Sequence, residues 1–417
     1  MSGGRGEFRS TMTEFPHTEA RETHRVVDTR CAMDSRQAVL HVNKLYHPWI
    51  GGVERVVQDL TEGLCRYEGV KATVLCCSPR GLGGHERVNG VPVIRCASLG
   101  MTMGMPISPT FLAAFFRLAR EYSLVHLHMP FPLGAAAAMA AAPVLQRTRT
   151  IVHYHSDVVR QKRLQWVYLP LLRSIVERAD RIIVSSPPYM QSEHLRPVLG
   201  KCVVIPPPID LTRHRRGNPE AARQLRMKLN ISPEERIVLF VGRFVYYKGL
   251  EYLVDAMREI RGTLVLVGDG PLKAAIRDRV VSGGPQFARR VRLVGAVSDL
   301  NLGSYYDIAD VFVLPSVERT EAFGIVQLEA MARGVPVVNT ELGTGVEWAS
   351  PHGVTGLTVP PRRSDALAGA IKMILEDEQL RETFSRNALN RVRAFDVRVI
   401  AGAVAQLYGE VLAQGSP

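Results

Sequence analysis

The chain has 417 residues, a formal net charge of +12 and 46% apolar residues. This length predicts two domains, and the apolar share is ordinary for a globular protein. The excess of Lys and Arg is scattered, and no zinc-finger spacing, basic-zipper heptad or RNA-binding aromatic signature accompanies it. We therefore expect anionic small ligands or an anionic membrane surface, and no nucleic acid, as partners.

The six cysteines include no CxxC pair, which predicts a reducing, cytoplasmic compartment. Residues 1–36 mix Arg, Glu and Asp without an apolar run, so we expect no signal peptide there. This segment is expected to be a disordered tail, or else the start is assigned too early, with Met33 as the internal alternative. The alanine-rich stretch 134–145 is too short to span a bilayer and predicts a buried helix.

From Ala38 onward, short apolar runs alternate with segments of helical period. Strands are expected at 38–42, 71–77, 124–128, 150–155 and 181–186, and a helix is expected at 53–64. Apolar strands that alternate with helices predict a parallel sheet covered by helices on both faces.

The pattern pauses in a proline-rich and then polar segment, "VVIPPPIDLTRHRRGNPE", which predicts a linker. A second series of strands follows at 236–242, 263–269, 291–295, 311–316 and 336–340. The fold class is therefore α/β, with two doubly wound, Rossmann-like domains. The expected divisions are a tail at 1–36, domains at 37–206 and 221–395, a linker at 207–220 and a C-terminal helix within 396–417. Ligands bind at the carboxyl ends of parallel strands, so a site is expected in a cleft between two such domains.

Two polar clusters follow predicted strands. Gly51 and Gly52 precede a helix, where a backbone without Cβ can approach a phosphate closely; the alternative is a simple tight turn. Arg243 and Lys248 follow a strand of the second series, where a guanidinium fork and an ammonium suit a diphosphate. The alternative there is two solvated surface cations.

A third cluster lies in "ERTEAFGIVQLEAM", residues 318–331, where two carboxylates stand eight positions apart. Glu321 is expected in a turn ahead of a helix that begins near Ile325 and stops before Pro336, with Glu329 two turns further in. A ligand lying across the helix start could contact both carboxylates, with phosphates on the free backbone amides. Carboxylates accept paired hydrogen bonds from neighbouring sugar hydroxyls. The alternative is two ordinary exposed helix residues.

Several motifs are absent from the sequence. There is no Walker motif, DxD or HExxH, and "GTGVEW" places Trp348 where a GxGxxG would have its third glycine. We therefore expect neither a nicotinamide dehydrogenase nor a P-loop ATPase, and we expect no metal and no cofactor. His126, His128, His153 and His155 alternate along two strands, so each pair shares a face. Without a carboxylate or cysteine beside them, they are expected to be structural.

Taken in order, these clusters resemble retaining glycosyltransferases of the GT-B fold, specifically glycosyltransferase family 4 (group 1), over residues 38–413. The motifs that carry the resemblance are "HPWIGGVERVV", "YHSD", "VGRFVYYKGL", "LVGDGPLK", "ADVFVLPS" and "EAFGIVQLEAMARGVPVV". The resemblance implies two Rossmann-like domains facing a cleft, and a C-terminal helix that crosses back to the first domain.

The resemblance also implies roles for individual residues. Arg243 and Lys248 would hold the donor diphosphate and stabilise the leaving group, Glu321 would bind sugar hydroxyls, Glu329 would bind the ribose, and His155 would lie near the sugar. The remaining donor contacts would come from the phosphate-facing loop of the first domain and from the backbone at the helix start: Gly51, Gly52, Phe323, Gly324, Ile325 and Val326.

The stretches "HSDVVRQKRL" and "TELGTGVEW" are most similar to bacterial transferases of mannosyl or rhamnosyl type that build cell-surface polysaccharides. This favours a hexose donor of the GDP-mannose type, with a UDP-sugar as the alternative, and a lipid-linked or saccharide acceptor. The segment 157–172 combines basic and aromatic residues, so it either rests on the anionic inner face of the plasma membrane or packs as an ordinary surface helix. A non-catalytic nucleotide-sugar-binding protein, an epimerase and a phosphorylase stay open as alternatives.

Overall fold

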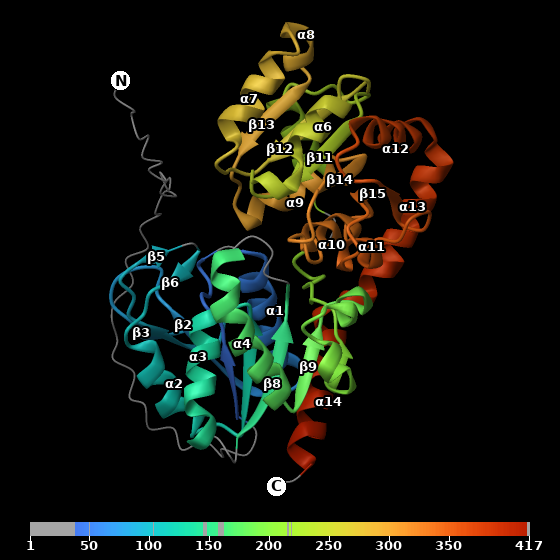
Figure 1. Cartoon of the computed structure of the whole chain (residues 1–417). Coiled ribbons are helices and arrows are strands. Elements are labelled where there is room, and N and C mark those ends of the chain that lie inside the picture. The colour runs from blue at the N-terminus through green and yellow to red at the C-terminus, as the bar shows by residue number, and fades with distance from the viewer. Residues whose placement is uncertain are drawn as a thin grey trace, which may run out of the picture. The chain divides into compact units, whose positions relative to one another are not determined.

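The computed structural model of the chain describes residues 38–49, 51–102, 104–144, 148–156, 162–214, 217 and 219–414. The tail expected at 1–36 lies outside these residues. The described chain forms two sheets, each with helices packed on it (Figure 1). The prediction of an α/β fold with two Rossmann-like domains is therefore confirmed, whereas the exact domain boundaries stay a prediction.

Within the described residues, eight strands form the N-terminal sheet, in the order β10-β9-β8-β7-β1-β2-β4-β3. β3 pairs antiparallel with β4, and the other neighbours pair in parallel. The strands are β1 (Ala38–Val42), β2 (Lys71–Cys77), β3 (Gly84–Val88), β4 (Val91–Cys96), β7 (Leu124–Met129), β8 (Arg149–Tyr154), β9 (Arg181–Val184) and β10 (Cys202–Val204). A small hairpin consists of β5 (Met101–Thr102) and β6 (Met105–Pro106). The helices are α1 (Gly52–Tyr67), α2 (Phe111–Ala119), α3 (Pro132–Ala141) and α4 (Lys162–Arg178), with 3-10 turns η2 (Ala142–Val144), η3 (Pro187–Gln191) and η4 (Arg196–Lys201).

The C-terminal sheet has six strands in the described chain, all parallel, in the order β13-β12-β11-β14-β15-β16. The strands are β11 (Ile237–Val241), β12 (Thr263–Val267), β13 (Val291–Gly295), β14 (Val311–Leu314), β15 (Val337–Thr340) and β16 (Gly356–Val359). The helices are α5 (Pro219–Lys228), α6 (Leu250–Ala256), α7 (Lys273–Val281), α8 (Pro285–Ala288), α9 (Asp299–Asp307), α10 (Ile325–Met331), α11 (Gly345–Ala349), α12 (Ser364–Glu376), α13 (Glu378–Arg391) and α14 (Val397–Ala413), with 3-10 turns η5 (Tyr246–Lys248) and η6 (Val392–Phe395).

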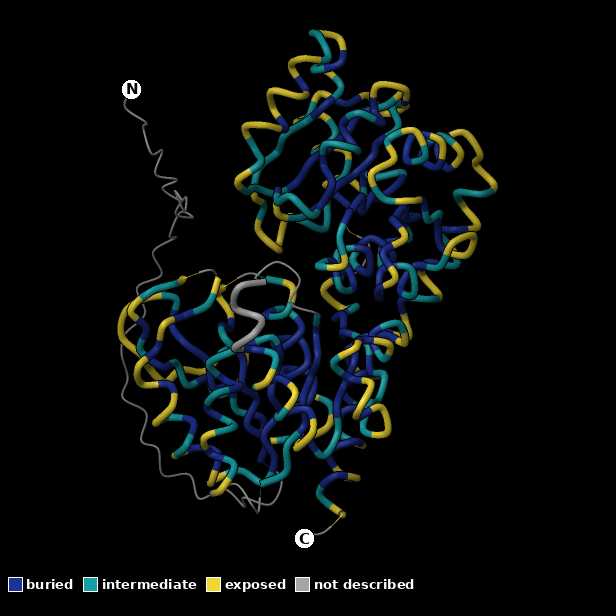
Figure 2. Tube along the Cα trace, in the orientation of Figure 1, coloured by how far each residue is buried: buried dark blue, intermediate teal, exposed yellow. Residues whose placement is uncertain are grey.

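The central strands of both sheets are buried on both faces, which explains why they read as unbroken apolar runs. Every residue of β1, β7, β11, β12 and β14 is buried. Figure 2 shows these strands in dark blue, with exposed positions on the helices and loops around them. The strands that the sequence did not predict are short or lie toward sheet edges, and β3 carries the polar sequence "GHERV".

The C-terminal helix packs against the first domain, as expected. In the linker, Ile209 accepts a hydrogen bond from the amide of Val397 at 2.9 Å and donates its own amide to Phe395 at 2.8 Å. Beyond this crossing, α14 packs on α1, where a Cβ on Gly63 would press against Val397 and Ala401. The apolar residues of α14 also share one buried cluster with residues of β1, β7, β8 and β9, so the helix packs on the N-terminal sheet.

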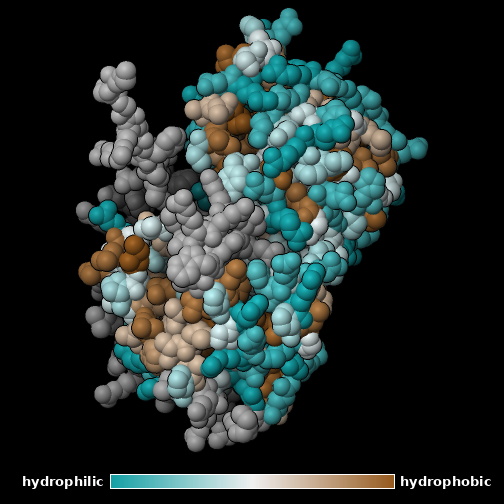
Figure 3. Space-filling model, in the orientation of Figure 1, coloured by the Kyte–Doolittle hydropathy of each residue, from teal (hydrophilic) through white to brown (hydrophobic). Residues whose placement is uncertain are grey.

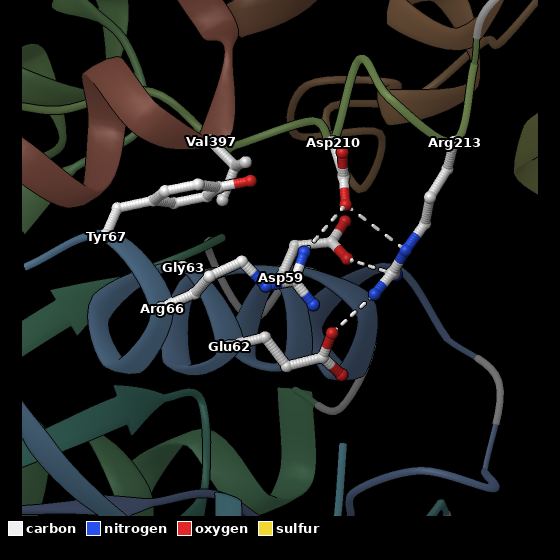
Figure 4. Close-up of a pocket in the computed structure, with 8 residues that line it drawn as sticks. All are labelled: Asp59, Glu62, Gly63, Arg66, Tyr67, Asp210, Arg213 and Val397. Carbon is white, nitrogen blue, oxygen red and sulfur yellow. Dashed lines mark hydrogen bonds and ion pairs between the residues drawn. The ribbon is translucent and has the colours of Figure 1, made fainter. Parts of the chain in front are cut away.

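A charged cluster fixes the linker to α1, as Figure 4 shows. The guanidinium of Arg213 donates to Asp59 Oδ1 at 3.0 Å and to Glu62, and it pairs with Asp210 at 3.3 Å. Burial raises the pKa of Asp59 to about 6, against the opposing charges of Arg55 and Arg213. The small hollow here is thus a joint between linker and helix, and none of the predicted donor residues lines it.

Two segments singled out in the sequence, the alanine-rich stretch and the basic segment 157–172, can be compared with the structure. The alanine-rich helix α3 is buried on one side, and Figure 3 shows apolar side chains gathered around it on this face. In the basic segment expected near a membrane, residues 157–161 lie outside the described residues. Tyr168 and Leu172, at its other end, pack in the core and so do not face outward. Among the described residues, no helix is both long enough and apolar enough to cross a membrane.

Candidate functional site

The candidate site is built around the carboxyl end of β14. Gly249 follows η5 with φ +62°, and a Cβ there would collide with the carbonyl oxygen of Pro315. The amide of Val317 donates to the carbonyl of Tyr247 at 2.8 Å. Glycine is therefore required at this position, because the η5 turn lies directly against the loop that follows β14.

This close approach brings Lys248 and Glu321 together. Lys248 Nζ lies 2.5 Å from Glu321 Oε2, and the hydroxyl of Ser316 donates to the same oxygen at 2.8 Å. Both charged side chains are buried. Burial is the largest single effect and would lower the pKa of Lys248, but the charge of Glu321, the Tyr247 hydroxyl and the hydrogen bond to Glu321 together outweigh it, so the pKa is raised. Lys248 therefore carries a full positive charge at neutral pH.

The backbone at Glu321 is held by the cap of α11. The hydroxyl of Thr344 donates to the carbonyl of Glu321 at 3.0 Å, and the amide of Gly345 donates to Ala322 at 2.8 Å. Thr344 and Glu347 form a capping box at the start of α11. The stretch "TELGTGVEW", to which no structural role was assigned from the sequence, thus fixes the turn that presents Glu321.

Helix α10 begins at Ile325, as the sequence predicted. Gly324 precedes it with φ +69°, and a Cβ there would press into Leu314 at the end of β14. Glu329 lies on this helix, and its Oε2 accepts a hydrogen bond from the hydroxyl of Tyr306 at 2.7 Å. The two carboxylates therefore have separate partners: Glu321 faces η5 and β14, whereas Glu329 faces α9.

The electrostatics of Glu329 differ from those of Glu321. Burial is the largest cause that raises the pKa of Glu329 to about 7, while the Tyr306 hydroxyl and the charge of Arg55 act in the opposite direction. Arg55 lies on α1 and pairs with Asp299 of α9 at 2.8 Å. Glu329 is thus a carboxylate that changes its charge near neutral pH.

The other predicted site residues described by the structure include Arg243, Gly51, Gly52 and His155. Arg243 is exposed on the loop after β11. A Cβ on Gly51 would collide with the carboxylate of Glu54, whereas Gly52, the first residue of α1, is exposed with open space at its Cβ position. His155 is buried directly after β8, and its Nε2 lies 2.9 Å from His128 Nδ1.

The structure adds three residues that the sequence did not single out. Ser316 and Tyr306 hydrogen-bond to the two carboxylates, and Thr344 holds the backbone of Glu321. The capping-box pattern of Thr344 and Glu347 was visible in the sequence and could have indicated the third of these. The contacts of Ser316 and Tyr306 had no local signal, because they depend on how separate elements pack.

Comparisons with known proteins agree with this architecture. The family model described as "Glycosyltransferase Family 4" matches residues 50–213, and the model described as "Glycosyl transferases group 1" matches residues 222–391. O-antigen chain mannosyltransferase C of Escherichia coli is 33% identical over 355 residues, which cover 85% of this chain and 92% of that protein. The chain belongs to the glycosyltransferases of family 4 and group 1.

Two further comparisons support the same assignment. D-rhamnosyltransferase WbpZ of Pseudomonas aeruginosa is 32% identical to this glycosyltransferase over 85% of this chain and 91% of that protein. Among solved structures, sucrose-phosphate synthase from Thermosynechococcus elongatus aligns with a TM-score of 0.73 and 27% identity, over 91% of this chain and 100% of the other. The predicted GT-B fold is therefore confirmed.

Proposed function

We propose that this glycosyltransferase moves a hexose from a GDP-mannose-type donor to a lipid-linked or saccharide acceptor in the assembly of a cell-surface polysaccharide. The relatives named as an O-antigen mannosyltransferase and a rhamnosyltransferase support this choice, because each aligns over most of the chain. A UDP-sugar stays the alternative donor. We propose that the enzyme acts at the cytoplasmic face of the membrane, where a lipid-linked acceptor would lie.

The observation that carries the proposal is the pair of carboxylates with separate partners around α10. Tyr306 occupies Oε2 of Glu329, so Oε1 is left to accept hydrogen bonds from ribose hydroxyls. The ammonium of Lys248 lies against Glu321. A diphosphate bound at this ammonium would therefore bring its sugar toward the carboxylate of Glu321. The amides of Phe323 to Val326 and the Gly51–Gly52 loop stay predicted phosphate contacts.

The proposed reaction breaks the bond between the sugar C1 and the phosphate oxygen. The acceptor oxygen forms a bond to C1, its proton passes to the departing phosphate, and the nucleoside diphosphate leaves. Arg243 and Lys248 neutralise the charge that develops on the leaving group, so the mechanism that we propose uses no metal. We further propose retention of configuration through attack on the face from which the phosphate departs, with a short-lived oxocarbenium-like ion.

The affinity for the nucleotide-sugar is expected to fall by about tenfold between pH 8 and pH 6. Glu329 has a pKa of about 7, and its protonated form loses one acceptor for the ribose hydroxyls. Calorimetric titration with the nucleotide-sugar measures this directly, since its phosphates do not titrate in this range. The matched control is Glu329→Gln, which should bind weakly at both pH values. An equally steep pH dependence in Glu329→Gln would contradict the assignment.

A donor screen tests the proposed function. The purified protein is incubated in EDTA with GDP-mannose, UDP-glucose, UDP-galactose or UDP-N-acetylglucosamine, each with and without a bacterial membrane lipid extract. We expect nucleoside diphosphate release from GDP-mannose, faster with the extract, and a product whose anomeric configuration by NMR matches the donor. Binding without release under every condition would indicate a non-catalytic protein, and release that requires added Mg²⁺ would contradict the metal-free mechanism.

A further inference from the structure

One face of the N-terminal sheet carries five histidines on neighbouring strands. His41 of β1 is in register with His126 of β7, and His128 is in register with His153 of β8. Side chains two residues apart share a face, so His126 with His128, and His153 with His155, point the same way. All five rings are buried, and Tyr408 of α14 contacts two of them, His41 and His126.

Four of these rings and the tyrosine form a continuous hydrogen-bonded chain. His155 Nε2 lies 2.9 Å from His128 Nδ1, and His128 Nε2 lies 3.1 Å from His41 Nδ1. His41 Nε2 lies 3.2 Å from the hydroxyl of Tyr408, which lies 2.6 Å from His126 Nδ1. The chain therefore runs from the end of β8, where His155 is expected near the sugar, to the C-terminal helix.

Burial keeps these rings neutral. It lowers the pKa of His41 to about 3 and the pKa values of His126, His128 and His155 well below the ordinary value, and neighbouring histidines add to the effect. A neutral imidazole has one donor nitrogen and one acceptor nitrogen. The tautomer of each ring in the chain therefore determines the tautomer of the next.

The distances at Tyr408 indicate the direction of the chain. A hydroxyl donates at 2.5–3.0 Å and an N–H at 2.7–3.2 Å. The 2.6 Å contact suits the tyrosine hydroxyl as donor to His126, and the 3.2 Å contact suits an N–H of His41 as donor to the tyrosine oxygen. In this direction His126 carries its proton on Nε2, which has no hydrogen-bond partner among the described residues. His128 and His155 then also donate through Nε2, which leaves the lone pair of His155 Nδ1 free to accept a hydrogen bond.

We propose that Tyr408 is a positioning residue that, through His41 and His128, holds His155 in the Nε2–H tautomer, so that its Nδ1 can accept a hydroxyl of the sugar substrate. The role of the sugar rests on the proposed function, but the tautomer does not. Without the hydroxyl of Tyr408, the N–H at His41 Nε2 would become a further buried N–H of this cluster without an acceptor, in addition to that of His126 Nε2, at an added desolvation cost. His41 would then carry its proton on Nδ1 and reverse the chain.

A buried metal is the other use for three close histidines, and two such groups are present in the described chain. The rings do not suit it, since a metal requires lone pairs that converge on one point. His126 and His128 stack at 4.5 Å with an angle of 12°, and His153 and His155 stack at 4.0 Å with an angle of 17°. Lone pairs in near-parallel rings run side by side and do not converge. This geometry favours the hydrogen-bonded chain over a metal site.

The test reads the tautomer by long-range 1H–15N NMR of histidine-labelled protein, with the His155 signal assigned from His155→Gln. We expect the Nε2–H form in the wild type and a shift toward the Nδ1–H form in Tyr408→Phe. The control is Tyr168→Phe, which removes a buried tyrosine hydroxyl of the same domain outside the chain and should leave His155 unchanged.

An unchanged His155 signal in Tyr408→Phe, or an Nδ1–H form in the wild type, would overturn the proposal. So would stoichiometric zinc in the purified protein that is lost in His128→Gln. None of these readouts needs sugar transfer, so they stay distinct from the donor screen. If the proposed function also holds, Tyr408→Phe should lower kcat several-fold. It should leave the affinity for the nucleoside diphosphate unchanged, because Tyr408 is not among the residues proposed to bind it.

Discussion

Replacement of Lys248 by methionine is expected to lower kcat for sugar transfer by about 10²–10³-fold, the range for loss of one preorganised group that stabilises transition-state charge. Lys248 is buried, and Glu321 keeps it charged. The departing diphosphate gains negative charge as the bond to C1 breaks, so the ammonium stabilises the transition state more than the bound donor. The effect should therefore fall mainly on kcat, measured by steady-state transfer from the donor found in the screen.

The matched control is Lys372→Met. Lys372 of α12 lies in the same domain and also pairs with a carboxylate, that of Glu259 after α6, at 3.2 Å, but this pair is on the surface. We expect its kcat to stay within about twofold of the wild type, as surface pairs contribute little. A Lys248→Met enzyme with nearly full kcat would show that the leaving group is stabilised by other groups.

Glu321→Gln is expected to destabilise the C-terminal domain by about 3–5 kcal/mol, because it leaves the buried charge of Lys248 without its counter-charge. The double variant Lys248→Met/Glu321→Gln should recover most of this stability, since both charges are then gone. Sugar transfer should not recover, because the double variant lacks both groups that are proposed to contact the donor. The double variant should therefore regain stability relative to Glu321→Gln without regaining sugar transfer.

Urea unfolding followed by circular dichroism measures the stability, and the same preparations serve for the transfer assay. Ser316→Ala provides a milder comparison, because it removes the hydrogen bond from a hydroxyl to the charged carboxylate of Glu321 and leaves the ion pair intact. We expect it to cost about 1.5–3 kcal/mol, the range for a hydrogen bond to a charged group. A double variant as unstable as Glu321→Gln would mean that Glu321 stabilises the fold through contacts other than Lys248.

Much of the fold was predictable because the central strands are buried on both faces. The runs "AVLHV" and "KATVLCC" matched β1 and β2 residue for residue, and the final helix matched α14. The polar edge strand β3 and the short β16 had no such signal. Their strand character comes from pairing with a neighbour, which local sequence does not encode.

The sequence predicted where the two carboxylates lie relative to the helix, but it did not predict their contacts. The spacing of Glu321 and Glu329 correctly placed one ahead of α10 and the other within it. The direct pairing of Lys248 with Glu321 depends on the close approach at Gly249, so no single motif revealed it. The histidines were correctly expected to share a face, but their extension to Tyr408 needed the packing of α14 on the sheet.

The measurement that tests this account most directly is a crystal structure of the protein with GDP, and with UDP as the alternative. The account predicts ribose hydroxyls within hydrogen-bond distance of Glu329 and a diphosphate at Lys248 and Arg243, so that the missing sugar would lie toward Glu321. A nucleotide bound elsewhere, or bound with its ribose away from Glu329, would contradict the central claim that the two carboxylates flank one nucleotide-sugar.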